Sequence, residues 1–326
     1  MFIYHNKIAA AKAMDHLGKK GVPFIFLIDF EMENIIINTD LKDHSMISYD
    51  MNGSSNIETT PSVKNITFDR DPMPFASYEK GFELVHSEIM KGNSFLLNLT
   101  YPTAINTNLS LEEIFASTSA KYKVLLHDSF VCYSPEIFIK IKNGAIYSYP
   151  MKGTIDASIE NAEEIILNDR KEIAEHYTIV DLIRNDLSKV AKKVEVTKFR
   201  FVDRIKTSQK ELLQVSSEIK GKLPTDWKSS LGKIIFKMLP AGSISGAPKK
   251  KTVDIIQAAE GQKRGYYTGI CGHFDGENLD SGVMIRFIEK QGNQLFYRSG
   301  CGITSLSNAA SEYEEMIDKV YLPISI

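Results

Sequence analysis

The spacing of hydrophobic positions changes along the chain, and each change predicts a different kind of element. Residues 1–91 predict a helix, a strand, an irregular polar loop and a second helix, at 9–19, 24–30, 40–64 and 78–91. From Lys121 onward the runs KVLLH, SFVCYS, IFIKI and AIYSYP are short and β-rich, which indicates an antiparallel meander. The stretch YPMKGT follows, so Lys152 is expected just past the last strand.

The second half of the chain returns to helical spacing before it becomes strand-rich again. Apolar side chains three or four positions apart predict one amphipathic helix over 161–190. Two strand-like segments and a short helix near 227–238 follow. A glycine-rich loop, PAGSISGAPK, then opens a helix that ends at Glu260, and the remainder predicts three strand runs and a last helix, at 265–274, 282–289, 294–298 and 313–320.

These elements predict an α+β fold with mostly antiparallel strands. No linker rich in proline or glycine, low-complexity tract or internal repeat divides the chain. We therefore expect one domain over residues 1–326, in which 1–91 act as scaffold and 92–326 carry the chemistry.

The composition excludes several classes of protein. A formal net charge of −2, from 39 basic and 41 acidic residues, does not favour nucleic acid or an anionic membrane as a partner. The N-terminal residues contain neither a signal-peptide core nor a membrane span. Three scattered cysteines suit thiols in a reducing cytosol, and zinc is not expected because no CxxC or HxxxH pair occurs. We expect a cytoplasmic protein.

The glycine-rich loop 240–249 is a candidate anion site. Gly242 and Gly246 let the backbone approach a ligand, and the N–H groups at the start of the following helix attract negative charge. The loop departs from the nucleotide-binding P-loop after its second glycine, so a carboxylate is the simpler guest. The alternative is a turn that only starts a helix.

Two pairs of glutamates share one spacing on two predicted helices: Glu172 with Glu175, and Glu312 with Glu315. If the helices face each other, the four carboxylates converge and suit Mg²⁺, a hard ion that prefers oxygen ligands. The alternative is a solvated face on each helix, with Glu315 and Lys319 as an exposed ion pair.

Four single residues have both a structural and a chemical interpretation. Glu136 in SPEIF and Arg298 in YRSGCG lie at strand ends, where each is either a surface residue or a ligand contact. Lys152, between a proline and a glycine, is on local grounds a solvated turn lysine. Cys271 in GICGH superficially suggests a glutaminase nucleophile, but a strand pattern offers no helix to activate the thiol.

Several long motifs occur in a fixed order between about Gly92 and Lys319: GNSFLLNLT, SPEIF, YPMKGT, KEIAEHYTIVDLIRNDL, QVSSEIKGKL, PAGSISGAPK, KRGYYTGICGHF, IRF, YRSGCGI and SEYEEMIDK. Together they resemble the chorismate-utilising enzymes, the family of anthranilate synthase component I, aminodeoxychorismate synthase component I, isochorismate synthase and salicylate synthase. The resemblance implies an anthranilate synthase component I-like fold, in which two packed, mostly antiparallel sheets flanked by helices enclose a chorismate pocket.

The resemblance also implies roles for individual residues. Glu175 and Glu315 match glutamates that bind Mg²⁺, with Glu172 and Glu312 as supporting acids. Glu136 matches the general acid or base beside the substrate ring. The matching substrate-binding positions are Ser243, Gly246, Ala247, Tyr267, Arg298, Gly300, Gly302 and Lys319.

Lys152 separates the members of the family, because aminodeoxychorismate synthases typically have P-I-K-G-T where anthranilate synthases have P-I-A-G-T. In the lysine-bearing members the amine is implied to attack C2 of chorismate, and ammonia from a separate glutamine amidotransferase subunit then adds at C4. The amine must be neutral, so a lowered pKa is expected. Gln214 in QVSS stands where histidine is common and can hydrogen-bond but not titrate, which gives Glu136 more of the acid catalysis.

The sequence therefore favours an aminodeoxychorismate synthase component I that uses Mg²⁺, with Lys152, Glu136 and Gln214 as catalytic residues. The alternatives are anthranilate synthase component I, an isochorismate or salicylate synthase that uses water, and a chorismate-binding regulatory protein without activity.

Overall fold

A computed structural model describes residues 1–58, 65–206, 211–322 and 324. Within these residues the strands form two antiparallel sheets. The ten-stranded sheet has the order β1-β3-β2-β15-β16-β10-β11-β14-β12, and β13 also pairs with β14. Its strands are β1 (Phe2–Tyr4), β2 (Phe24–Ile28), β3 (Ile35–Asn38), β10 (Ile137–Lys142), β11 (Ala145–Ser148), β12 (Met151–Asp156), β13 (Lys192–Lys206), β14 (Glu211–Lys222), β15 (Ile270–Phe274) and β16 (Leu279–Val283).

The eight-stranded sheet has the order β5-β4-β8-β9-β17-β18-β7-β6. Its strands are β4 (Ile47–Met51), β5 (Ser54–Ser55), β6 (Phe68–Asp71), β7 (Leu97–Thr107), β8 (Tyr122–Leu126), β9 (Phe130–Ser134), β17 (Phe287–Gln291) and β18 (Gln294–Ile303). Both sheets contain strands from the N-terminal 91 residues, so this region completes the sheets rather than standing apart from them.

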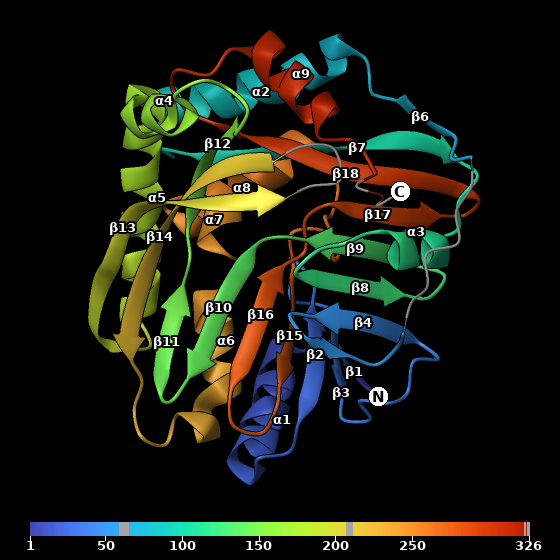
Figure 1. Cartoon of the computed structure of the whole chain (residues 1–326), viewed down its shortest axis with the longest axis vertical. Coiled ribbons are helices and arrows are strands. Elements are labelled where there is room, and N and C mark those ends of the chain that lie inside the picture. Colours follow the sequence, from blue (N-terminus) through green and yellow to red (C-terminus); the bar gives the residue numbers. More distant parts are fainter. Residues whose placement is uncertain (59–64, 207–210, 323, 325–326) are drawn as a thin grey trace.

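Helices cover the outer faces of both sheets, which gives the layers helix, sheet, sheet, helix (Figure 1). The outer core of the ten-stranded sheet includes side chains from α1 (Lys7–Lys20), α5 (Arg170–Ser188), η1 (Trp227–Ser230) and α6 (Leu231–Met238). The eight-stranded sheet packs against α2 (Phe75–Met90), α8 (Lys249–Glu260) and α9 (Ala309–Asp318). The short helices are α3 (Leu111–Ser117), α4 (Ala162–Asn168) and α7 (Gly242–Ser245).

The run FIFLI of β2 shows how the sequence produces these layers. All five of its residues are buried, because the strand is central in its sheet and both faces are covered. Phe24, Phe26 and Ile28 pack into the helix-side core, whereas Ile25 and Leu27 pack between the two sheets. A continuous apolar run is therefore required here, because alternation of apolar and polar residues would place polar side chains in one of the two cores.

The predicted α+β class, with two packed, mostly antiparallel sheets flanked by helices, is confirmed. Among the described residues, no helix is both long and apolar enough to cross a membrane.

Several predicted boundaries are wrong. The polar loop 40–64 contains β4 and β5, because Ile47, Tyr49 and Met51 alternate into the inter-sheet core; its residues 59–64 lie outside the described residues. The helix predicted over 161–190 is interrupted at Asp169, where the backbone is extended. The Asp169 side chain caps α5, because its Oδ1 accepts the Glu172 N–H at 2.9 Å.

Two strand predictions are also wrong near the C-terminal end. The run 265–274 is a strand only from Ile270, since a turn precedes it. The run 282–289 is not one strand: β16 ends at Val283 in one sheet and β17 begins at Phe287 in the other. A sequence pattern cannot show this change of sheet, because both pieces are equally apolar.

Candidate active site

A cavity of about 250 Å³ lies where β18, α5, the end of β11 and the glycine-rich loop meet. Its volume is near the lower end of ligand pockets, which typically reach ~300–1,000 Å³, so a small ligand fits best. The structure brings most of the predicted site residues into its walls, namely Glu136, Lys152, Glu175, Ser243, Gly246, Tyr267, Arg298, Gly300, Gly302, Glu315 and Lys319.

Lys152 lies on β12, not past the last strand as predicted. The register of β12 against β14 shifts between Met151 and Thr154, and Gly153 in between has φ +85°, which only glycine adopts without strain. A Cβ at Gly153 would also lie 3.2 Å from Glu172 Oε2 on α5. The glycine therefore lets the strand kink and approach α5, where Lys152 Nζ lies 2.5 Å from Glu175 Oε2.

The electrostatic setting of Lys152 differs from the prediction. Burial lowers the pKa of its amine, but the hydrogen bond and charge of Glu175, together with Glu172 and Glu315, outweigh burial and raise the pKa. The lysine is therefore an ammonium group in this arrangement, and the predicted lowering of its pKa is wrong for the protein alone.

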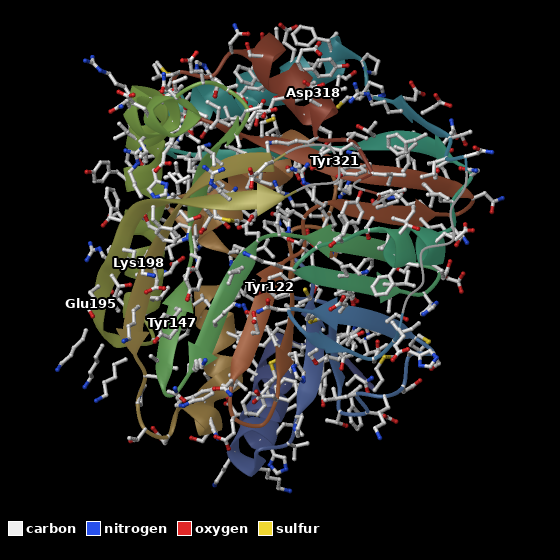
Figure 2. All side chains as sticks on the ribbon, in the orientation of Figure 1. Tyr122, Tyr147, Glu195, Lys198, Asp318 and Tyr321 are labelled. Carbon is white, nitrogen blue, oxygen red and sulfur yellow. The ribbon has the colours of Figure 1, made fainter. Side chains whose placement is uncertain are left out.

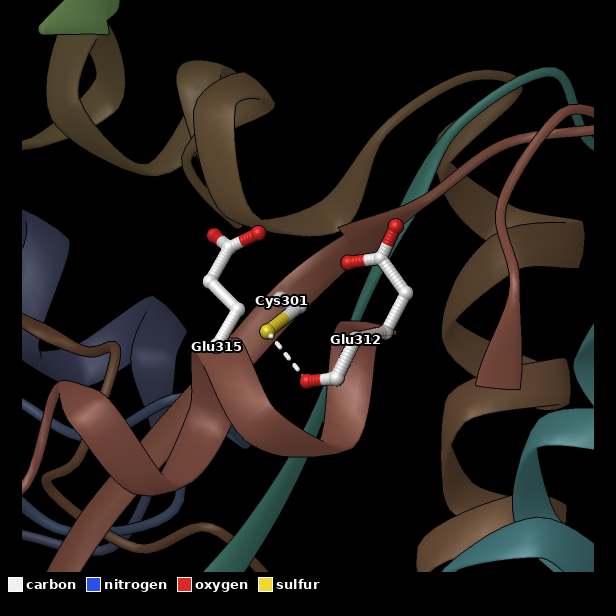
Figure 3. Close-up of side chains that lie close together, drawn as sticks. All are labelled: Cys301, Glu312 and Glu315. Atoms are coloured by element: carbon white, nitrogen blue, oxygen red, sulfur yellow. Dashed lines mark hydrogen bonds between the residues drawn. The ribbon is translucent and has the colours of Figure 1, made fainter. Parts of the chain in front are cut away.

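Glu315 approaches the same region from α9, beside Glu312 and Cys301 (Figure 3). The candidate ligand atoms of these three residues lie within 4.8 Å of one another. Cys301 Sγ donates to the Glu312 backbone oxygen at 3.0 Å, and burial raises the pKa of its thiol to about 12. Because a thiol that keeps its proton is a poor metal ligand, the useful donors here are carboxylate oxygens.

The family-implied Mg²⁺ fits these donors. Glu175, Glu172 and Glu315 all act on the Lys152 ammonium, and Glu315 Oε1 is also 2.7 Å from Lys319 Nζ. Carboxylate oxygens from α5 and α9 thus gather at one side of the cavity, and a hard divalent cation prefers such oxygen ligands. Glu312 is turned toward its own loop, where its Oε1 accepts the Ser307 hydroxyl at 2.7 Å, so it fits a supporting role.

Glu136 also lines the cavity, from the turn between β9 and β10. Burial raises the pKa of its carboxyl, and a hydrogen bond from Ser243 Oγ to Glu136 Oε1, 2.5 Å long, partly opposes the rise. A buried carboxyl with a raised pKa keeps its proton to higher pH than an exposed one and can donate it to a leaving group.

Arg298 and Lys319 provide positive charge along the β18 wall. The Arg298 guanidinium is buried 5.6 Å from the centre of the Tyr267 ring, donates to Lys263 O at 3.0 Å and has its Nε 3.5 Å from Glu289 Oε1. Lys319 Nζ donates to Gly300 O at 2.9 Å. A ligand with carboxylates suits a wall of this kind.

The structure does not bring Gln214 into the cavity. Its neighbours Leu213 and Val215 on β14 are buried, so Gln214 faces the other side of the strand, where its Nε2 lies 3.5 Å from Thr154 Oγ1. Ala247 is also outside the lining, because its carbonyl accepts Phe95 N–H at 3.2 Å and fixes the glycine-rich loop to the chain before β7.

Residues 11–325 match the family model described as chorismate binding enzyme. The chain belongs to the chorismate-binding enzyme family. An uncharacterized PabA-like protein of Haemophilus influenzae is 55% identical over 311 residues, covering 95% of each chain. Anthranilate synthase component 1 of Haloarcula marismortui is 32% identical, covering 79% of this chain and 56% of the relative. Aminodeoxychorismate synthase component 1 of Bacillus subtilis is 28% identical, covering 81% and 58%.

Solved structures share the fold of this chorismate-binding enzyme. The menaquinone-specific isochorismate synthase of Escherichia coli has a TM-score of 0.76 at 15% identity, covering 98% of this chain and 82% of that one. Anthranilate synthase component I of Streptococcus pneumoniae has a TM-score of 0.65 at 25% identity, covering 80% and 60%.

Sequence reasoning missed two charged residues in the cavity wall of this family member. Asp186 is buried on α5 and accepts Lys189 at 2.8 Å and Lys249 at 2.6 Å, so it joins α5 to the start of α8. Arg286 donates to Lys319 O at 3.1 Å. Asp186 and Arg286 both occur inside the recognised motifs, and this position was the available signal.

Proposed function

We propose that the chain is an aminodeoxychorismate synthase component I, which converts chorismate and ammonia to 4-amino-4-deoxychorismate for folate synthesis. The observation that carries the proposal is Lys152 in the cavity wall, held by Glu175 and in the same cavity as Glu136. A solvated turn lysine would be expected at the surface, without an ion pair in a cavity wall. The likeness to the Bacillus subtilis enzyme supports the same assignment.

In this proposal Lys152 is the nucleophile. Its ammonium first loses a proton to water that enters the cavity, since the Lys152 side chain is 33% exposed and Glu175 is assigned to Mg²⁺. The free amine then forms a bond to C2 of chorismate and gives up a proton to water, while both ring double bonds shift and the C4 hydroxyl leaves as water with a proton from Glu136. Ammonia next forms a bond at C4, the double bond shifts back, and the C2–N bond to Lys152 breaks.

Glu175 and Glu315 would hold Mg²⁺, with Glu172 and Glu312 beside them. The ion would supply positive charge for the ring carboxylate of the substrate. Arg298, Tyr267 and Lys319 would bind the second carboxylate, so that the ring lies between Lys152 and Glu136.

We also propose that ammonia comes from a separate glutamine amidotransferase subunit and that residues 1–326 act as one catalytic domain. The strands of 1–91 belong to both sheets, which supports a single domain. Cys132, Cys271 and Cys301 are free and buried, which suits a reducing, cytosolic setting.

The test is chromatographic identification of the product made from chorismate, Mg²⁺ and ammonium by wild type, Lys152→Ala and Lys140→Ala. Lys140 is a matched control, because it belongs to the same meander, is similarly exposed (26% against 33%) and pairs with Asp280 at 2.9 Å. We expect aminodeoxychorismate from wild type and Lys140→Ala, and a loss on the order of 10⁴-fold in Lys152→Ala.

Other products would refute the assignment in different ways. Anthranilate would identify an anthranilate synthase, and turnover without nitrogen would identify an isochorismate or salicylate synthase. Binding of chorismate without consumption would identify a regulatory protein. Full activity of Lys152→Ala would show that Lys152 is not the nucleophile.

A further inference from the structure

One face of the ten-stranded sheet is left open over β10, β11, β13 and β14. On the opposite face, Ile139, Ile141, Ile146 and Ile219 are buried in the core beneath the helices. Because side chains alternate along a strand, their neighbours point away from that core. In the part of the chain that the structure describes, the helices packed against β13 and β14 are α4 and α5, and the inter-sheet core is built mainly at the β2, β3 and β15 end of this sheet.

The open face is rich in lysine. The strand register places Lys142, Ala145, Lys222 and Lys192 in one row across the sheet, and Lys140, Tyr147, Lys220 and Glu195 in the next. Figure 2 shows Tyr147, Glu195 and Lys198 on these strands, at the left of the view. We call the lysines of this surface the lysine face: Lys140, Lys142, Lys192, Lys198, Lys220 and Lys222.

On the described strands, the six lysines of this face lie among three carboxylates, those of Glu195, Glu218 and Asp280. Within the described residues, Lys142, Lys192 and Lys222 have no carboxylate at ion-pair distance, and Lys220 and Lys198 instead lie 5.7 Å from the centres of the Tyr147 and Phe201 rings. Lys140 is the exception, since it pairs with Asp280. The surface is also hollowed, by a groove of about 540 Å³ between the β10–β11 turn and the start of β13.

The lysine face is continuous with the active-site cavity. Tyr147 stacks on Tyr149 at a ring separation of 6.5 Å and an angle of 11°, and Tyr149 lines the cavity. Lys152 follows three residues later on β12. A protein bound on the lysine face would therefore lie beside the cavity that has to receive ammonia.

We propose that the lysine face docks an acidic surface of the subunit that supplies ammonia. The inference rests on the proposed function, and it adds the place of docking and the charge of the partner. Unpaired lysines on an open sheet attract an acidic partner and set its orientation, and placement beside Tyr149 shortens the path of ammonia.

The test compares glutamine-dependent with ammonia-dependent turnover, using the purified glutaminase subunit from the same organism. The docking variant is Lys142→Glu/Lys220→Glu/Lys222→Glu. The control is Lys12→Glu/Lys80→Glu/Lys237→Glu, which reverses three exposed lysines on α1, α2 and α6. We expect the docking variant to weaken binding of the glutaminase by at least about 100-fold, because like charges then face each other, while its ammonia-dependent rate stays within about twofold of wild type.

The outcomes separate the two proposals. Equal glutamine-dependent rates in the docking and control variants overturn the inference, as does a wild type that gives no glutamine-dependent turnover with excess glutaminase. If the docking variant loses ammonia-dependent activity as well, the neutral set Lys142→Gln/Lys220→Gln/Lys222→Gln is measured, and a normal glutaminase affinity there also overturns it. Absence of aminodeoxychorismate from ammonia with wild type refutes the proposed function instead.

Discussion

Two glutamate–cation pairs in this molecule have opposite character. The side chains of Arg264 and Glu260 are each about 1% exposed and form a buried ion pair. Both have further hydrogen bonds: Glu260 accepts the N–H and the hydroxyl of Thr100, and Arg264 donates to Asn98 O. Lys152 and Glu175 are 33% and 12% exposed, line a cavity, and have further carboxylates beside them.

The difference distinguishes a structural pair from a functional one. The Arg264–Glu260 pair is balanced and closed, so it holds β7 and the turn before β15 in place. The Lys152–Glu175 pair instead lies in a cavity wall beside the carboxylates of Glu172 and Glu315, where a ligand can reach it. A group with a perturbed pKa and a charged partner in a cavity is a candidate for a functional role.

The largest expected effect comes from breaking the balanced pair. Glu260→Gln leaves the buried Arg264 charge uncompensated, so we expect the free energy of unfolding to fall by about 3–5 kcal/mol. Urea denaturation measures it. Glu88→Gln is the control, because its partner Lys91 is 61% exposed and removal of such a surface pair has little effect on stability. Similar losses in both variants would contradict the contrast.

A smaller effect is expected at the unbalanced pair, and it should depend on metal. If Glu175 binds Mg²⁺, the ion stabilises wild type by RT ln(1 + [Mg²⁺]/Kd), about 2.7 kcal/mol at 100 times Kd. Glu175→Gln should lose most of that gain, and in EDTA it should destabilise the protein less than Glu260→Gln does, because Glu172 and Glu315 still act on Lys152. Glu164→Gln, on the exposed surface of α4, is the control. An unchanged Mg²⁺ effect in Glu175→Gln would place the metal elsewhere.

The sequence allowed the fold class and most of the cavity residues to be predicted, because long motifs in a fixed order constrain the chain more than local propensity does. Local patterns failed where tertiary contacts decide the outcome. Asp169 interrupts one helix through a cap, and the run after Val283 changes sheets without any change in hydrophobicity. Gln214 was predicted as catalytic from its place in a motif, but alternation along β14 turns it away.

The charge state of Lys152 could not be predicted either. A motif gives the identity of a residue but not the sum of burial and surrounding charges, and here three carboxylates from α5 and α9 reverse the expected direction of the pKa shift. The open lysine face is a similar case, since only the register of four strands shows that lysines far apart in sequence share one surface.

The smallest effect is expected at Glu136, which differs from both ion pairs. It is a buried carboxyl whose pKa is shifted by burial and by the hydroxyl of Ser243. Burial raises the pKa, and the Ser243 hydrogen bond lowers it. Ser243→Ala removes the lowering contribution, so the pKa rises further and Glu136 keeps its proton to higher pH. If Glu136 is the acid, the decline of ammonia-dependent kcat/KM at high pH should move to higher pH in Ser243→Ala. Ser243→Thr keeps a hydroxyl and should restore the wild-type profile, whereas a shift to lower pH in Ser243→Ala would exclude Glu136 as the proton donor.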